Sequence, residues 1–161
     1  MSADIDPIRK EIAFQLRSGN AHLSFEEVIA GFPPKLRGTV PKGLPYSAWQ
    51  LLGHIRITQE DILRFSRNVD GGYVTPNWPQ SYWPESVAPP NDSAWEESVQ
   101  QVIADREQFI QLVEKGDLFT PFPWGDGQTL LREAFVIIDH TAYHLGEIVA
   151  VRRLLGAWPS Q

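Results

Sequence analysis

Long segments of helical periodicity, separated by segments rich in proline and glycine, most constrain how this chain can fold. Nine of its thirteen prolines fall within residues 31–45 and 71–91, where a helix cannot continue because proline lacks the backbone N–H and clashes with the preceding turn. Outside these segments apolar residues recur at the three- and four-residue spacing of an amphipathic helix, and no stretch shows the period-two alternation of a half-buried strand. The sequence therefore predicts an all-α protein.

The periodicity predicts four long helices and one short one. Ser24 followed three residues later by Glu27 is a capping box, which starts the short helix. The second long stripe of apolar residues extends to Val69, and Gly156 is expected to cap the last helix. Four amphipathic helices with long crossover loops after the second and third predict an up-down four-helix bundle. The predicted ranges are residues 7–16, 48–68, 92–116 and 129–155 for the long helices and 25–30 for the short one.

Composition narrows the class of protein. The 161 residues fit a single domain, and 42% hydrophobic residues can form a core. A net charge of -6 without any run of Lys or Arg argues against nucleic-acid binding. We find neither a secretory signal nor an apolar run of about 20 residues, so a soluble cytoplasmic protein without a membrane partner is expected. The chain has no cysteine, and any metal must be held by His and carboxylates.

Two histidines, His140 and His144, lie four residues apart in the last predicted helix. This spacing places both imidazoles on one face, where two ring nitrogens can reach one metal ion. On a helical wheel, both rings lie on the side of the helix that faces the bundle. The alternative is a chance pair that forms hydrogen bonds in the core, and the pair alone does not decide between the two.

A third histidine favours the metal. His54 lies at the edge of the apolar stripe of the second long helix, and facing helices of a bundle can bring it opposite His140 and His144. Three imidazoles that leave a coordination position open are typical of a catalytic metal. Taken alone, His54 is better explained as a histidine at the rim, satisfied by water.

These motifs resemble those of the DinB superfamily of metalloenzymes. The resemblance implies that the bundle is of the kind called DinB/YfiT-like. The resemblance is carried by the tract from Trp49 to His54, by an apolar helix that continues through Asp61, and by the distant run from His140 to Glu147. It implies a four-helix bundle, a divalent metal ion on His54, His140 and His144, and a homodimer. Members with assigned chemistry include thiol-dependent S-transferases and a mycothiol-dependent isomerase.

Further candidates lie near these histidines. Glu147 is a catalytic candidate: it could be a fourth ligand, a partner for an imidazole N–H, a general base toward metal-bound water, or a rim carboxylate paired with Arg. Asp61 could orient His54 through water or be a solvated surface residue. Trp83 and Trp124, in proline-rich loops, are candidates for the walls of a substrate pocket, or they simply cover the bundle.

The sequence thus predicts a metal-dependent enzyme with zinc or nickel on three histidines. Hydrolysis of a small-molecule substrate and S-transfer with a low-molecular-weight thiol both fit, and the sequence does not choose between them. The alternative is a non-enzymatic bundle that a metal ion stabilises and that serves as a binding or dimerisation module.

Overall fold

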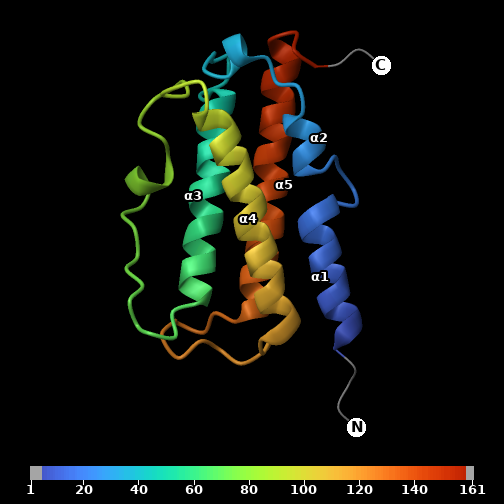
Figure 1. Ribbon diagram of the computed structural model, residues 1–161, viewed down its shortest axis with the longest axis vertical. Helices are drawn as coiled ribbons and strands as arrows, with labels where there is room; N and C mark the ends of the chain where they lie inside the picture. Colours follow the sequence, from blue (N-terminus) through green and yellow to red (C-terminus); the bar gives the residue numbers. More distant parts are fainter. Residues whose placement is uncertain (1–4, 159–161) are drawn as a thin grey trace.

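The computed structural model describes residues 5–158, and within that range the chain is all-α, without strands. Four main helices pack together (Figure 1), which confirms the predicted fold class. The elements, in chain order, are α1 (Asp6–Ser18), α2 (Phe25–Ile29), η1 (Pro34–Leu36), α3 (Ala48–Ser66), η2 (Gln80–Tyr82), α4 (Ala94–Lys115) and α5 (Leu130–Leu154), where η marks a single 3₁₀ turn.

Local capping explains where three of the helices begin. The predicted capping box of Ser24 and Glu27 is present at α2. Ser47 and Gln50 form a second capping box at α3, and the hydroxyl of Thr129 accepts the backbone N–H of Arg132 at α5. The end of α3 is a correction, because the helix stops at Ser66 and Val69, with 79% of its surface exposed, lies beyond it.

Helices α3 and α5 are neighbours that run in opposite directions. Residues 67–93, between α3 and α4, form the long loop. It returns along the outside of α3 to the upper end of the bundle, so α3 and α4 run parallel (Figure 1). The loop after α4 stays at the lower end, and α5 therefore runs antiparallel to α3. Helix α3 contacts both α4 and α5, and α1 packs against α4 and α5. The long loop and the facing sides of α3 and α5 form one flank of the molecule.

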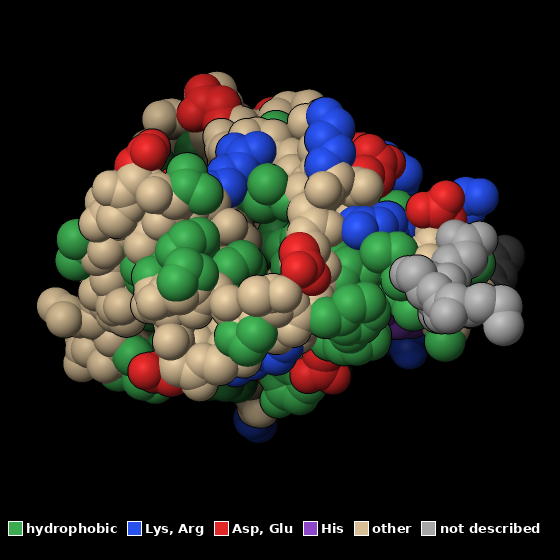
Figure 2. Space-filling model, turned by 90° about the horizontal axis from the view of Figure 1, so that it is seen from below, with side chains coloured by type: hydrophobic (Ala, Val, Ile, Leu, Met, Phe, Trp, Pro, Cys, Tyr) green, Lys and Arg blue, Asp and Glu red, His purple; other side chains and the backbone are tan. Residues whose placement is uncertain are grey.

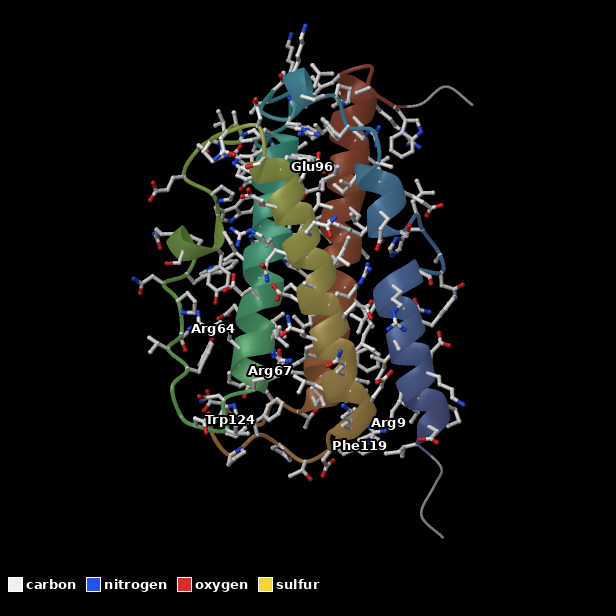
Figure 3. The ribbon with its side chains drawn as sticks, viewed as in Figure 1. Arg9, Arg64, Arg67, Glu96, Phe119 and Trp124 are labelled. Carbon is white, nitrogen blue, oxygen red and sulfur yellow. The ribbon has the colours of Figure 1, made fainter. Side chains whose placement is uncertain are left out.

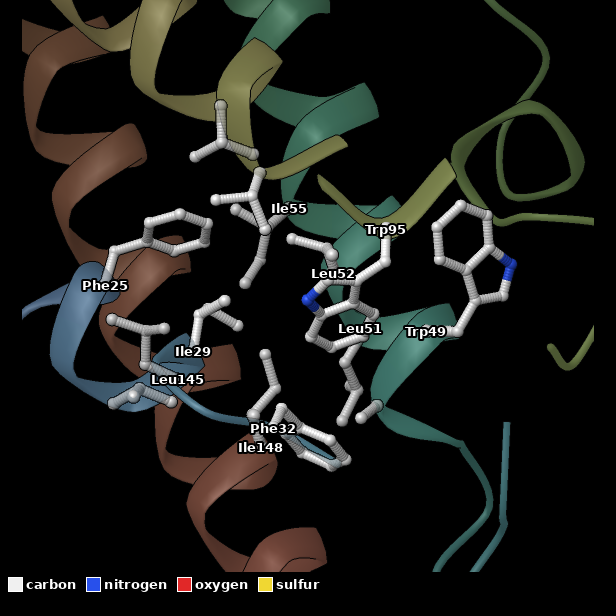
Figure 4. Packing of buried hydrophobic residues seen from close by; sticks show 14 of the residues in the cluster. Phe25, Ile29, Phe32, Trp49, Leu51, Leu52, Ile55, Trp95, Leu145 and Ile148 are labelled. Carbon is white, nitrogen blue, oxygen red and sulfur yellow. The ribbon is translucent and has the colours of Figure 1, made fainter. Parts of the chain in front are cut away.

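The hydrophobic core consists of an upper and a lower cluster. The upper cluster surrounds Leu52, Trp95 and Ile148 (Figure 4), and the lower one surrounds Leu63 and Phe109. Among the described residues, cluster members on α3 stop at 55 and resume at 62, and those on α5 stop at 138 and resume at 145. The middle turns of these two helices thus belong to neither cluster, and most of their side chains are polar.

The lower end of the bundle exposes apolar side chains. Figure 2 views this end, where hydrophobic groups lie between scattered charges. Phe119, in the loop between α4 and α5, lies at this end (Figure 3) and is 51% exposed. Single exposed apolar side chains are common on protein surfaces, so we assign this end no function.

Helix α5 is also long and apolar enough, by length and composition alone, to cross a membrane. One such helix is weak evidence, because the core helix of a soluble bundle passes the same test. Here α5 packs against α1, α2, α3 and α4, and it buries the charged residues Glu133 and Arg152. These contacts and buried charges place α5 within the bundle.

The close approach of the long loop to α3 at Gly53 yields a stability prediction. A Cβ atom at Gly53 would lie 2.2 Å from Cγ of Pro84, so Gly53→Ala forces the loop away from the helix. Overpacking costs about 1–3 kcal/mol, which over most of that range exceeds the gain of about 1 kcal/mol in helix propensity. We expect urea denaturation to show a net loss of stability in Gly53→Ala.

The double variant Gly53→Ala/Pro84→Ala is the control, because it removes the ring that the new methyl group meets. It should be more stable than the sum of the two single changes predicts. Simple additivity of the three free energies of unfolding would contradict the proposed contact.

Candidate metal centre

His54, His140 and His144 come together in the middle of the bundle. One ring nitrogen of each lies within 4.8 Å of the others, and Nε2 of His140 lies 3.0 Å from Nε2 of His54. His54 and His144 are 3% and 7% exposed, whereas His140 is partly exposed. The structure therefore brings the three predicted ligands, from α3 and α5, to one point that solvent reaches beside His140.

The orientation of His54 is set by the long loop. Its Nδ1 lies 2.7 Å from the backbone carbonyl oxygen of Tyr82, which can only accept a hydrogen bond, so Nδ1 carries the proton. The lone pair is then on Nε2, which faces His140. Trp83 stacks on the ring of His54, with 3.9 Å between centroids and 3° between planes. Two neighbouring loop residues thus hold this imidazole in position.

The orientation of His144 is set within α5. Its Nδ1 lies 2.6 Å from Oε2 of Glu147, one turn further along the helix. The carboxylate accepts this hydrogen bond, which leaves the lone pair of His144 on Nε2. Of the roles open to Glu147 from the sequence, the contact matches that of a partner for an imidazole N–H. Such carboxylate–imidazole pairs are typical of histidines that bind metals.

Burial disfavours the charged form of His54 and of His140. Burial, and secondly the neighbouring His144 and His54, lower the pKa of His140 to about 3. Burial also lowers the pKa of His54. Two or more adjacent imidazolium ions would repel each other, and the uncharged rings instead offer nitrogen lone pairs. Uncharged imidazole is the form that binds a metal ion.

The spacing of the nitrogens suits one divalent ion. Two nitrogens bound at about 2.1 Å in tetrahedral geometry lie about 3.4 Å apart. The cluster offers nitrogens at separations from 3.0 Å up to 4.8 Å, so small side-chain adjustments suffice. Imidazole nitrogens suit zinc, nickel, copper and iron. The three histidines therefore form a possible metal site, and the identity of the metal is open.

The two tryptophans predicted to wall a pocket lie in different places. Trp83 covers the ring of His54 and also stacks on Tyr46, 4.1 Å between centroids. Trp124 lies beneath the lower end of α3 (Figure 3), where its Nε1–H donates to the backbone oxygen of Phe65 at 2.9 Å. Trp83 is thus next to the histidines, and Trp124 lines a separate cleft. Their roles toward a substrate remain predictions.

The contacts of two residues of the site were not predicted from the sequence. Tyr82 was not a candidate for contact with a histidine, and Asp61 was a candidate to orient His54. Tyr82 holds His54 through a backbone carbonyl, which carries no side-chain signature. Asp61 contacts no histidine; instead it accepts hydrogen bonds from the hydroxyl groups of Tyr73, at 2.9 Å, and Tyr82, at 2.6 Å. Tyr82 therefore connects the histidine cluster to Asp61, two turns further along α3.

Comparison with protein families gives a match that covers the residues of the cluster. The sequence profile of the DinB superfamily matches residues 22–148, a range that includes the three histidines and Glu147. No curated protein and no solved structure matches the chain significantly.

The contact of Glu147 with His144 predicts a graded effect on metal binding. Glu147→Gln keeps an acceptor for the Nδ1 proton but removes the charge, and loss of such a partner typically weakens metal binding by about 10–100-fold. We expect about tenfold weaker binding for Glu147→Gln and a larger effect for Glu147→Ala, measured by competition with a chromogenic chelator.

Asp139→Asn is the matched control, because Asp139 is an exposed acid on the same helix. It should bind metal as the unchanged protein does. Equal affinities for Glu147→Ala and Asp139→Asn would contradict the role assigned to Glu147.

Proposed function

Because the chain belongs to the DinB superfamily, we propose that it is a metal-dependent enzyme acting on a small-molecule substrate. His54, His140 and His144 would bind one divalent cation, zinc or nickel, in the middle of the bundle. The reaction is hydrolysis or a thiol-dependent S-transfer. A low-molecular-weight thiol would be the second substrate in the latter case.

The observation that carries this proposal is the number of protein donors. Among residues 5–158, three histidines form the cluster and no fourth donor joins them. Glu147 contacts Nδ1 of His144 and is not a member of the cluster. Structural zinc sites normally have four protein ligands, whereas catalytic sites have three and an open position. The donor set therefore favours catalysis.

The residues around the cluster have separable tasks. A divalent ion bound there would supply a Lewis acid that lowers the pKa of a water molecule or of a thiol. The carbonyl oxygen of Tyr82 holds the Nδ1 proton of His54, and Oε2 of Glu147 holds that of His144. Trp83 shields one face of His54 from water. Substrate would approach beside His140, the most exposed of the three rings.

The competing function is a metal-stabilised bundle without catalysis. The cluster joins α3 to α5, so a bound ion would link these helices whether or not it turned over a substrate. A purely structural ion would raise the stability of the protein and leave every substrate unchanged.

Metal analysis tests the proposal first. Untagged protein prepared with excess zinc or nickel and then desalted should contain close to one ion per chain. The variant His140→Ala should contain less than about 0.1. His22→Ala is the matched control, since His22 is an exposed histidine outside the cluster, and it should retain full metal content.

The same samples test catalysis. Loaded protein should convert activated esters or transfer a thiol to an electrophile, and His140→Ala should lose that activity while His22→Ala keeps it. Full metal content without turnover in either assay would favour the structural alternative. Less than about 0.1 ion in the unchanged protein would rule out the three-histidine site.

The proposal includes a homodimer. Its support is the outward side of α5, where Phe135 is 57% exposed and Tyr143 is 66% exposed. We expect light scattering to give twice the 18.2 kDa chain mass, because burial of such side chains in a second copy removes them from water. Phe135→Glu should yield a monomer, whereas Phe14→Glu, at a 45% exposed site on α1, should remain dimeric. A monomeric unchanged protein would refute this part.

A further inference from the structure

A cleft of about 590 Å³ lies on the flank where the long loop covers α3 and α5. It begins one turn from the histidines on both helices, at Thr58, four residues after His54, and at Val136, four residues before His140. Four residues of helix correspond to about 6 Å. The cleft is thus positioned to hold the remainder of a molecule whose reacting end lies at the histidine cluster.

Aromatic side chains form much of the wall of this cleft. Tyr73, Trp78 and Tyr82 come from the long loop, and Trp124 comes from the loop before α5. The rings of Trp78 and Tyr82 pack edge to face, with 5.2 Å between centroids. Trp78 is nevertheless 70% exposed, which leaves most of its surface available to a ligand. Aromatic faces attract cations, most strongly when several surround the same site.

The charges in the cleft are mostly negative. Asp61, Asp126 and Glu133 line it, and Arg132 is the one cation among its lining residues. Arg132 is already paired, with 2.5 Å between its Nη1 and Oε1 of Glu133. The next cation, Arg64, is exposed and does not line the cleft.

Asp61 is held as an acceptor without a cationic partner. The hydroxyl groups of Tyr73 and Tyr82 each donate to one of its oxygens. Burial and the contact with Asp61 raise the pKa of Tyr73 to about 12, so this phenol keeps its proton and donates it to Asp61. Within the described part of the chain no Lys, Arg or His forms an ion pair with Asp61. A carboxylate among aromatic rings attracts a positively charged group.

We propose that this cleft binds an organic cation, and that the substrate carries an alkylammonium group at the end remote from the reacting bond. Asp61 follows His54 by seven residues, two turns of α3 on nearly the same face, which corresponds to about 10 Å. That span sets the distance between the ammonium group and the reacting bond. The inference names a substrate class for the proposed enzyme and rests on that function only in assigning the reacting end to the histidines.

Calorimetry with choline and with its uncharged carbon analogue 3,3-dimethylbutan-1-ol tests this inference. The two probes have the same shape, so the charge decides between them. Choline should bind at least tenfold more tightly than the analogue. Asp61→Asn should weaken choline binding at least tenfold while Asp139→Asn, an exposed acid outside the cleft, leaves it unchanged.

One further variant and one competition experiment complete the test of the cation site. Tyr82→Phe retains the ring and removes one donor to Asp61, so a folded protein with weakened choline binding would support the site if Asp61→Asn fails to fold. Equal binding of the two probes would overturn the inference. So would displacement of choline by low concentrations of Mg²⁺, since the cleft would then be a site for inorganic cations.

Measurement in His140→Ala separates this inference from the proposed function. Choline should bind the variant as it binds the unchanged protein, because the cleft residues are intact. Choline binding together with absence of turnover in the loaded enzyme would refute the catalytic function and leave the cation site standing. Turnover of uncharged substrates without choline binding would refute the cation site alone.

Discussion

The hydrogen bond from Nδ1 of His54 to the carbonyl oxygen of Tyr82 is the contact on which the site most depends. It assigns the lone pair of His54 to the nitrogen that faces His140, and it fixes the loop that covers the flank of α3 and α5. The same tyrosine donates its hydroxyl to Asp61. One loop residue therefore sets the orientation of a candidate metal ligand and the position of a carboxylate in the adjoining cleft. A change in the course of this loop would disturb both together.

The gap between the two hydrophobic clusters explains why this chemistry lies in the middle of the bundle. Upper and lower clusters supply the burial that holds α3 against α5, and apolar burial is the main favourable contribution to folding. The intervening turns can then carry imidazoles and carboxylates, whose polar atoms are paired with Tyr82, Glu147 and two phenol hydroxyls. Buried polar groups cost free energy only where they lack such partners, so the site is compatible with a stable bundle.

Features that depend on neighbouring residues in the sequence could be predicted. Helical periodicity predicts the all-α bundle, and Ser24 with Glu27 predicts the start of a helix. The four-residue spacing of His140 and His144 predicts that both lie on one face of their helix. His54 could be predicted as the third ligand because helices of a bundle face each other. Contacts made by the long loop could not be predicted, since they depend on the path of a segment without periodicity. The carbonyl of Tyr82 illustrates this, because any residue could have supplied it. Val69 was misplaced because it follows the apolar spacing of α3 although the helix has already ended.

The antiparallel arrangement of α3 and α5 converts two local spacings into one asymmetric cleft. Asp61 follows His54 by seven residues on α3, and Glu133 precedes His140 by seven residues on α5. Because the helices run in opposite directions (Figure 1), both carboxylates lie below the histidines at the same end, and both line the cleft. Parallel helices with these spacings would place the two acids at opposite ends. The histidine cluster and the cleft together therefore have a nitrogen-donor end and an acidic, aromatic end. Such polarity orients an elongated cationic molecule in one direction only, with its uncharged end at the histidines.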